Sequence, residues 1–147
     1  PAIINALKAQ GMTDLVLDTS VAVPLLVMSH VAHRAVSAAI GDRSAALAGH
    51  ALHETYAVLT RLPGDARLAP SDAVRLMRAR FESPVVLDSR SVRSSPAVLA
   101  AAGVSGGATY DGLVALAARS AGLPLATRDR RAQGTYRLLD VSIELLG

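Results

Sequence analysis

The chain has 147 residues, which suits a single domain whose hydrophobic core needs no disulfide or metal support. Cysteine is absent, so disulfides and thiolate metal sites are excluded, and a reducing, cytoplasmic setting is expected. Fourteen arginines and one lysine against twelve acids give a net charge of +3, which permits nucleic-acid binding without demonstrating it. No apolar run approaches the roughly 18 residues that span a bilayer, so no membrane association is expected.

Met12 is a candidate natural start of the protein. We therefore expect residues 1–11 to be an N-terminal extension or a cloning remnant, and we assign them no function. Residues 12–147 contain no internal repeat, low-complexity tract or linker, which predicts one domain.

The first half of the chain alternates short apolar runs with helical patterns. Leu15–Leu17 reads as a buried strand, and the hydroxyls of Thr19 and Ser20 mark a helix start after it. Helical spacing continues through His30–Ile40, and Ala45–Leu47 could be a second strand.

The second half continues this alternation. The expected elements, in chain order, are a helix through Leu52, Tyr56 and Leu59, a helix opened by Ser71-Asp72, a strand at Val85–Leu87, a helix from Pro96 to Ala102, a helix opened by Asp111, a strand at Leu123–Thr127 and a last strand within Leu138–Leu146. Strands separated by helices over the whole length predict an α/β fold, with a mainly parallel sheet of about five strands between two helical layers.

Four of the twelve acids stand at the boundaries of apolar elements or within one. Asp18 and Asp129 each follow a predicted strand, Asp111 opens an apolar helix, and Glu54 lies inside another helix. Carboxylates at the ends of buried strands cost free energy unless a cation gathers them. In parallel sheets, sites form at the carboxyl ends of the strands, where two of these acids lie.

A divalent metal is the simplest cation that would gather four acids. Two carboxylates about 4 Å apart repel by ~1 kcal/mol in water and by ~4 kcal/mol at an effective dielectric constant near 20. Mg²⁺, with Mn²⁺ as the alternative, takes hard oxygen ligands and keeps several waters, which points to phosphate chemistry. Ser20 and Thr127 each stand two residues from a predicted ligand, so their hydroxyls are expected to orient carboxylates or metal waters.

Each acid also has a purely local explanation. Asp18 and Asp111 could cap their own helices, Asp129 could pair with a neighbouring arginine, and Glu54 could face solvent. The residues alone leave the choice between one shared site and four local roles open.

Four short motifs, taken in order, resemble those of PIN-domain ribonucleases, especially the VapC toxins of bacterial VapBC toxin–antitoxin pairs. The motifs are Leu-Asp-Thr-Ser (17–20), His-Glu-Thr-Tyr-Ala-Val-Leu-Thr-Arg-Leu (53–62), Tyr-Asp-Gly-Leu-Val-Ala-Leu-Ala (110–117) and Leu-Ala-Thr-Arg-Asp-Arg-Arg (125–131). The resemblance runs from about Asp14 to the C-terminus. Each motif alone is weak, but four in order are fairly specific.

The resemblance implies that the chain is a three-layer PIN-like domain with Asp18, Glu54, Asp111 and Asp129 as its catalytic and metal-binding pocket. Asp18 and Asp111 would be the most direct ligands, with Glu54 and Asp129 acting partly through water. Thr127 matches the hydroxyl residue that stands two positions before the fourth acid in this family.

Gly112 is a departure from the family pattern, in which alanine more often follows the third acid. We expect a looser first helical turn at this position and no lost ligand. The segment before Met12 is likewise unmatched.

Arg128, Arg130 and Arg131 surround the fourth acid and are candidates for steering RNA phosphates towards the pocket. Ordinary surface charge, or pairing with Asp129, explains them equally well.

Rival sites have weaker support. His50, His53 and Glu54 share a helix face and could hold zinc, but their spacing matches no zinc-protease motif. The glycines at 103–107 lack the lysine of a phosphate-binding loop and predict a turn. No Gly-x-Ser-x-Gly setting for a catalytic serine is present.

The resulting hypothesis is a Mg²⁺-dependent endoribonuclease, the toxin of a type II toxin–antitoxin pair. The resemblance implies a VapB-like antitoxin as partner, bound over the apolar segment Val21–Met28, and a homodimer. One alternative is a catalytically weak PIN-like module that binds RNA or protein. A metal-dependent phosphatase is another, but Asp18-Thr19-Ser20 lacks the second acid of its usual Asp-x-Asp motif.

Overall fold

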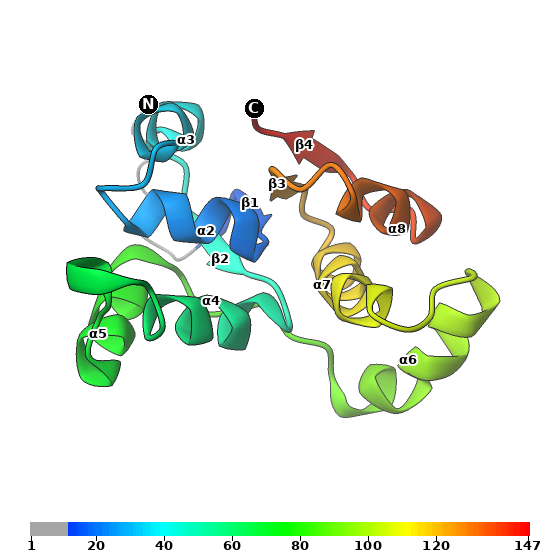
Figure 1. Ribbon diagram of the computed structural model, residues 1–147. Coiled ribbons are helices and arrows are strands. Elements are labelled where there is room, and N and C mark those ends of the chain that lie inside the picture. The colour runs from blue at the N-terminus through cyan, green and yellow to red at the C-terminus, as the bar shows by residue number, and fades with distance from the viewer. Residues whose placement is uncertain (1–11) are drawn as a thin grey trace.

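Four short strands form a parallel sheet at the centre of the protein (Figure 1). The structure is a computed structural model that describes residues 12–147, so the expected extension before Met12 lies outside the described residues. The strand order is β2-β1-β3-β4, and every ladder is parallel. The strands are β1 (Leu15–Leu17), β2 (Ala45–Leu47), β3 (Leu125–Thr127) and β4 (Ile143–Leu145).

Seven α-helices and one 3-10 turn surround this sheet within residues 12–147. They are α2 (Thr19–Leu26), α3 (His33–Ile40), α4 (Ala51–Leu59), η1 (Gly64–Ala66), α5 (Pro70–Arg80), α6 (Ser89–Ala101), α7 (Ala108–Ala121) and α8 (Ala132–Leu138). None of the described helices combines the length and apolar character that a bilayer crossing requires.

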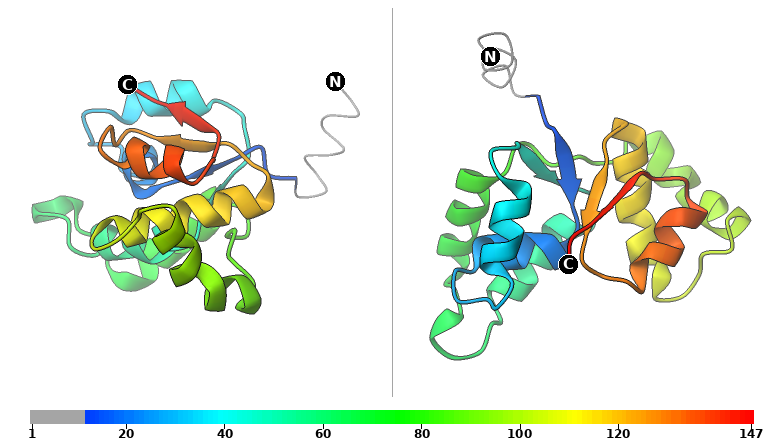
Figure 2. Two further views of the ribbon diagram at one scale, coloured as in Figure 1. Left: turned by 90° about the vertical axis from the view of Figure 1, so that its right-hand side faces the viewer. Right: turned by 90° about the horizontal axis from the view of Figure 1, so that it is seen from above.

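The sheet separates two hydrophobic clusters, because successive side chains of a strand point to opposite faces. Leu15 and Leu17 join the cluster formed with α2, α3 and α5, whereas Val16 joins the cluster formed with α6, α7 and α8. The two groups of helices accordingly lie on opposite sides of the strands (Figure 2). All three residues of β1 are fully buried, as expected for a parallel strand covered on both faces.

The predicted three-layer α/β/α architecture with a parallel sheet is therefore confirmed, with four strands where about five were expected. The predicted strand at Val85–Leu87 is reduced to a single bridge between Val85 and Ala48. Val85 donates to the Leu47 carbonyl and accepts from Gly49, but the next residue, Val86, is 61% exposed. The strand pairing therefore stops at Val85.

Helix α6 begins seven residues before the predicted start at Pro96. Asp88 caps it by accepting a hydrogen bond from the Ser91 amide, so Pro96 lies in the interior of the helix. A proline in the interior of a helix removes the N–H that would bond the carbonyl four residues earlier, here that of Val92. The hydroxyl of buried Ser95 donates to this same carbonyl at 2.7 Å and replaces the missing bond.

Three other helix starts differ from prediction by a few residues. Helix α5 begins at Pro70, because proline is well suited to the first helical position. Helix α7 begins at Ala108, so Asp111 lies in its first turn and does not open it. The helical pattern from His30 gives a helix only from His33, where α3 begins.

We predict that Ser95→Ala lowers the free energy of unfolding by about 0.5–1.5 kcal/mol, because the Val92 carbonyl loses its replacement donor. Ser94→Ala is the matched control, since Ser94 is exposed and should cost no more than about 0.5 kcal/mol. Chemical denaturation measures both. The cost of Ser95→Ala should shrink in a Pro96→Ala background, which restores the amide; an unchanged cost there would contradict this explanation.

Candidate active site

A cavity of about 380 Å³ opens at the carboxyl ends of β1 and β3. These neighbouring strands flank the point where the strand order reverses, because β2 and β3 lie on opposite sides of β1. A crevice for ligands is expected at such a point in a parallel sheet. All four acids singled out in the sequence line this cavity: Asp18, Glu54, Asp111 and Asp129.

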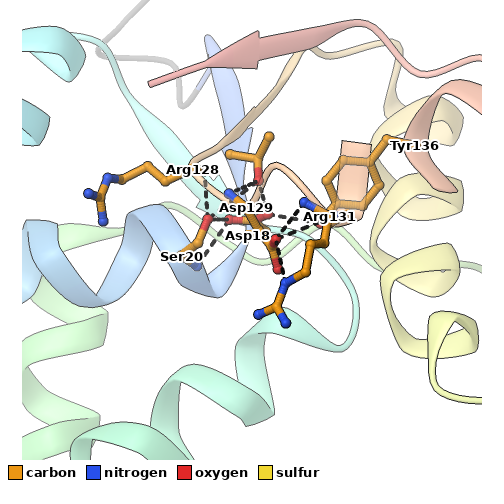
Figure 3. Close-up of polar contacts among 8 residues, drawn as sticks. Asp18, Ser20, Arg128, Asp129, Arg131 and Tyr136 are labelled. Atoms are coloured by element: carbon orange, nitrogen blue, oxygen red, sulfur yellow. Dashed lines mark hydrogen bonds and ion pairs between the residues drawn. The ribbon is translucent and has the colours of Figure 1, made fainter. Parts of the chain in front are cut away.

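Asp18 lies deepest of the four, with 5% of its surface exposed. Its Oδ1 accepts from the amide of Ser20, 3.0 Å away, and from the hydroxyl of the same residue. Its Oδ2 accepts from the hydroxyls of Thr127 and Tyr136, the latter at 2.8 Å (Figure 3). Burial raises the pKa of the Asp18 carboxyl, and these hydrogen bonds offset part of the rise.

Ser20 and Thr127 join the ends of the two strands through their hydroxyls. The Ser20 Oγ accepts from the amide of Arg128 at 2.7 Å, and the Thr127 Oγ1 accepts from the amide of Asp129 at 3.1 Å. Both hydroxyls also donate to Asp18. The two predicted supporting residues therefore contact the predicted ligand, and they orient its carboxylate.

Asp129 reaches the cavity from the turn between β3 and α8. Its Oδ1 accepts from the amide of Arg131 at 2.8 Å and, more weakly, from that of Ala132 at 3.4 Å. The Arg131 guanidinium lies 3.9 Å away and is almost fully exposed, so this ion pair contributes little. Arg128 lines the cavity, whereas Arg130 is exposed.

Asp111 and Glu54 enter from the first turns of α7 and α4. Burial raises the pKa of the Asp111 carboxyl, and the nearby charges of Asp129, Asp18 and Glu54 raise it further. The charge of His50 acts in the opposite direction. The charges of the other three acids therefore all act on Asp111.

The acids form an open group around the cavity. Among residues 12–147, no three His, Asp or Glu side chains converge as a closed metal-ligand cluster. The zinc alternative built on His50, His53 and Glu54 therefore has no formed site in this structure. The His50 ring instead stacks on Tyr110, with the ring centroids 4.7 Å apart.

Tyr136 is the residue of the site that sequence reasoning missed. It is fully buried on α8, and its hydroxyl is one of the donors to Asp18. A buried tyrosine needs a partner for its hydroxyl, so an aromatic residue seven positions after the fourth acid was a usable signal. His30 also lines the cavity.

Gly112 departs from the family pattern for a reason visible in the packing. A Cβ built on Gly112 would lie 2.5 Å from Leu99 Cδ2, because α6 crosses α7 closely at this point. Leu99 is itself buried and occupies the space that an alanine methyl group would need. Glycine at this position therefore accommodates α6 and leaves Asp111 in place.

The PIN domain model matches residues 15–138, most of the chain and all four acids. This chain belongs to the PIN-domain family. It is 57% identical over 129 residues to ribonuclease VapC27 of Mycobacterium tuberculosis, covering 88% of this chain and 94% of that protein. It is 45% identical over 131 residues to ribonuclease VapC40 of the same species, covering 88% and 96%. The predicted resemblance to VapC-type PIN ribonucleases is thereby confirmed.

A solved structure shows the same fold at low sequence identity. VapBC2 from Rickettsia felis, bound to a DNA fragment from its promoter, superposes with a TM-score of 0.63 at 14% identity, covering 90% of this chain and 98% of that chain. At this identity the likeness shows the fold alone. The role of each acid in this PIN domain stays a prediction.

We predict that Tyr136→Phe lowers the free energy of unfolding at neutral pH by about 1.5–3 kcal/mol, the range for a hydrogen bond to a charged group. Phenylalanine fills the same buried space, so the loss of stability measures the contribution of the hydroxyl alone. Tyr56→Phe, at a tyrosine 37% exposed on α4, should change stability by less than about 0.5 kcal/mol. Equal stability of Tyr136→Phe and wild type in chemical denaturation would show that Asp18 does not need this donor.

The raised pKa of Asp111 predicts a pH dependence of stability in the absence of divalent metal. An acid whose pKa is higher in the folded than in the unfolded state binds its proton more tightly when folded. Its contribution to stability therefore falls as the pH rises from its unfolded pKa through its folded pKa. Asp111→Asn should gain stability relative to wild type across this window, measured by denaturation in EDTA. A stability difference that is constant with pH would contradict the coupling.

Proposed function

We propose that this PIN domain is a Mg²⁺-dependent endoribonuclease and the toxin of a type II toxin–antitoxin pair. The observation that carries the proposal is the lining of one cavity by four carboxylates in a chain 57% identical to a VapC ribonuclease. The donor set is suitable for a hard cation, because the four predicted ligands offer only oxygen atoms. Burial, and then the charges of the neighbouring acids, raise the pKa of Asp111, and a divalent ion would offset both effects.

The four acids would hold the metal in two ways, directly and through water. Asp18 and Asp111 are the proposed direct ligands, with Glu54 and Asp129 acting partly through water. Asp18 already accepts four hydrogen bonds, so direct ligation would displace or share one of these donors. Mn²⁺ has the same preference for oxygen and is the alternative ion. Bound there, the ion would supply Lewis-acid activation of water and neutralise charge on the phosphate.

The proposed reaction is hydrolysis of an RNA phosphodiester bond, in which the side chains of the cavity assist an attacking water. Water attacks the phosphorus in line, the bond from phosphorus to the 3′ oxygen breaks, and the products carry a 5′-phosphate and a 3′-hydroxyl. Glu54, the most exposed of the four acids, is suited to accept the proton of the attacking water. Arg128 lines the cavity and would attract the RNA backbone, with Arg130 and Arg131 further out on the surface.

A VapB-like antitoxin is the proposed protein partner, since the structural neighbour VapBC2 is by its name a pair of this kind. In the predicted docking segment, residues 21–26 are buried, but Met28 is 83% and the nearby Val31 97% exposed. Val23, Pro24 and His30 of the same stretch line the acidic cavity. A basic residue of the antitoxin tail could reach the cavity from there, and a homodimer is the proposed assembly.

Asp111→Asn tests the enzymatic function. We predict that it lowers RNA cleavage in Mg²⁺ on the order of 10²-fold or more while the protein stays folded, because it removes a ligand and relieves repulsion. Asp140→Asn is the matched control, since Asp140 is exposed and has the positive φ of 56° that asparagine tolerates. Cleavage is followed on labelled RNA, with and without excess EDTA.

Two outcomes would count against the enzyme. Cleavage that persists unchanged in EDTA would refute the metal-dependent mechanism. Cellular toxicity that survives Asp111→Asn would favour the alternative, a PIN-like module that binds RNA or protein without cutting.

A further inference from the structure

His50 and Tyr110 form a stacked pair that the proposed mechanism does not use. Their ring centroids lie 4.7 Å apart with 29° between the ring planes. Tyr110 is 55% exposed, so a large part of the pair is open to solvent. The chain has only one phenylalanine and three tyrosines, which makes an exposed ring at this place worth explaining.

The backbone holds the two rings together at a close approach of α4 and α7. Gly49, with φ +50°, donates to the Val85 carbonyl at 2.8 Å and directly precedes His50. A Cβ on Gly49 would lie 3.1 Å from the Leu113 carbonyl oxygen and 3.4 Å from the Ala117 Cβ. The residue that precedes His50 therefore lies close to α7, the helix that carries Tyr110.

The pair lies beside the acidic cavity. Tyr110 directly precedes Asp111, and His50 stands one helical turn before Glu54, whose amide donates to the His50 carbonyl at 3.1 Å. The charge of His50 also acts on the Asp111 carboxyl, whose pKa it lowers against the larger effect of burial. A ligand on the exposed ring would therefore lie next to a phosphate held in the acidic cavity.

We propose that the His50–Tyr110 pair is a stacking platform for one unpaired nucleobase of the substrate. This inference rests on the proposed ribonuclease function and names a base-binding site beside its acids. Every nucleobase has a flat π-face, so an aromatic side chain can stack on it without reading its sequence. In a duplex both faces of each base are covered by its neighbours, so the platform has no access to paired bases.

The test compares binding of a short single-stranded oligoadenylate with binding of a duplex of the same length. Binding is measured by fluorescence anisotropy in Ca²⁺, with a check that the RNA stays intact. Tyr110→Leu should weaken binding of the single strand by about 5- to 100-fold, the loss of one stacked base, and leave the duplex unchanged. Tyr110→Phe keeps the ring and should bind like wild type. Tyr56→Leu, at the other exposed tyrosine, is the matched control.

An abasic scan locates the stacked base and separates stacking from misfolding. One abasic position in the oligonucleotide should weaken binding to wild type, and Tyr110→Leu should add no further loss at that position. A folded Tyr110→Leu that binds single strands as tightly as wild type would overturn the proposal. So would a Tyr110→Leu loss that is the same for every abasic position.

The outcomes also separate this proposal from the function on which it rests. If wild type binds oligoadenylate through Tyr110 but cuts no RNA in Mg²⁺, the ribonuclease assignment fails and the platform stands. If wild type cuts RNA and Tyr110→Leu retains both KM and kcat, the platform fails and the ribonuclease stands. A variant that loses only affinity for a partner protein would assign the surface to that partner and overturn the proposal.

Discussion

The arrangement of the acidic pocket depends on the buried carboxylate of Asp18. A charge at the end of the central strand is tolerated because four hydrogen bonds converge on it, and charge-assisted bonds of this kind are stronger than neutral ones. The donors belong to Ser20 on α2, Thr127 on β3 and Tyr136 on α8. One side chain therefore holds three elements around the cavity that it also lines.

The parallel order of the strands determines which residues can reach this pocket. Because β1 and β3 are neighbours, Asp18 and Asp129 leave the sheet at the same edge although 111 positions separate them in the chain. The helices that follow cannot continue in the plane of the sheet, so they turn over its two faces and leave a crevice between them. Glu54 on α4 and Asp111 on α7 close that crevice from outside the sheet.

Short sequence patterns predicted the elements whose formation depends on neighbouring residues. The apolar run before Asp18 and the hydroxyls after it located β1 and α2, and the alternation of elements gave the layers. The helix start predicted at Pro96 was wrong, because the Ser95 hydroxyl replaces the hydrogen bond that proline removes. This hydrogen bond to the Val92 carbonyl can be seen only in the formed helix.

Contacts between distant segments were beyond the reach of the sequence. The hydrogen bond from Tyr136 joins residues 118 positions apart, and Leu99 excludes a methyl group at Gly112 from another helix. Neither contact has a local pattern, because each depends on how the helices pack. The four acids could be identified from short local motifs, because each lies at the boundary of an apolar element or within one. Only the folded structure shows that they line one cavity.

The local and the shared explanations of these acids are compatible. Asp18 caps α2, Asp129 accepts from amides at the start of α8, and Glu54 and Asp111 lie in the first turns of α4 and α7. Four helix N-termini thus point their partial positive charge at one group of carboxylates, each such contact being worth about 0.3–1 kcal/mol. These contacts do not remove the electrostatic penalty at the site, since the pKa of Asp111 is still raised by its burial and by its acidic neighbours. The helices therefore stabilise each acid singly, and the repulsion that remains among them is what a divalent cation would neutralise.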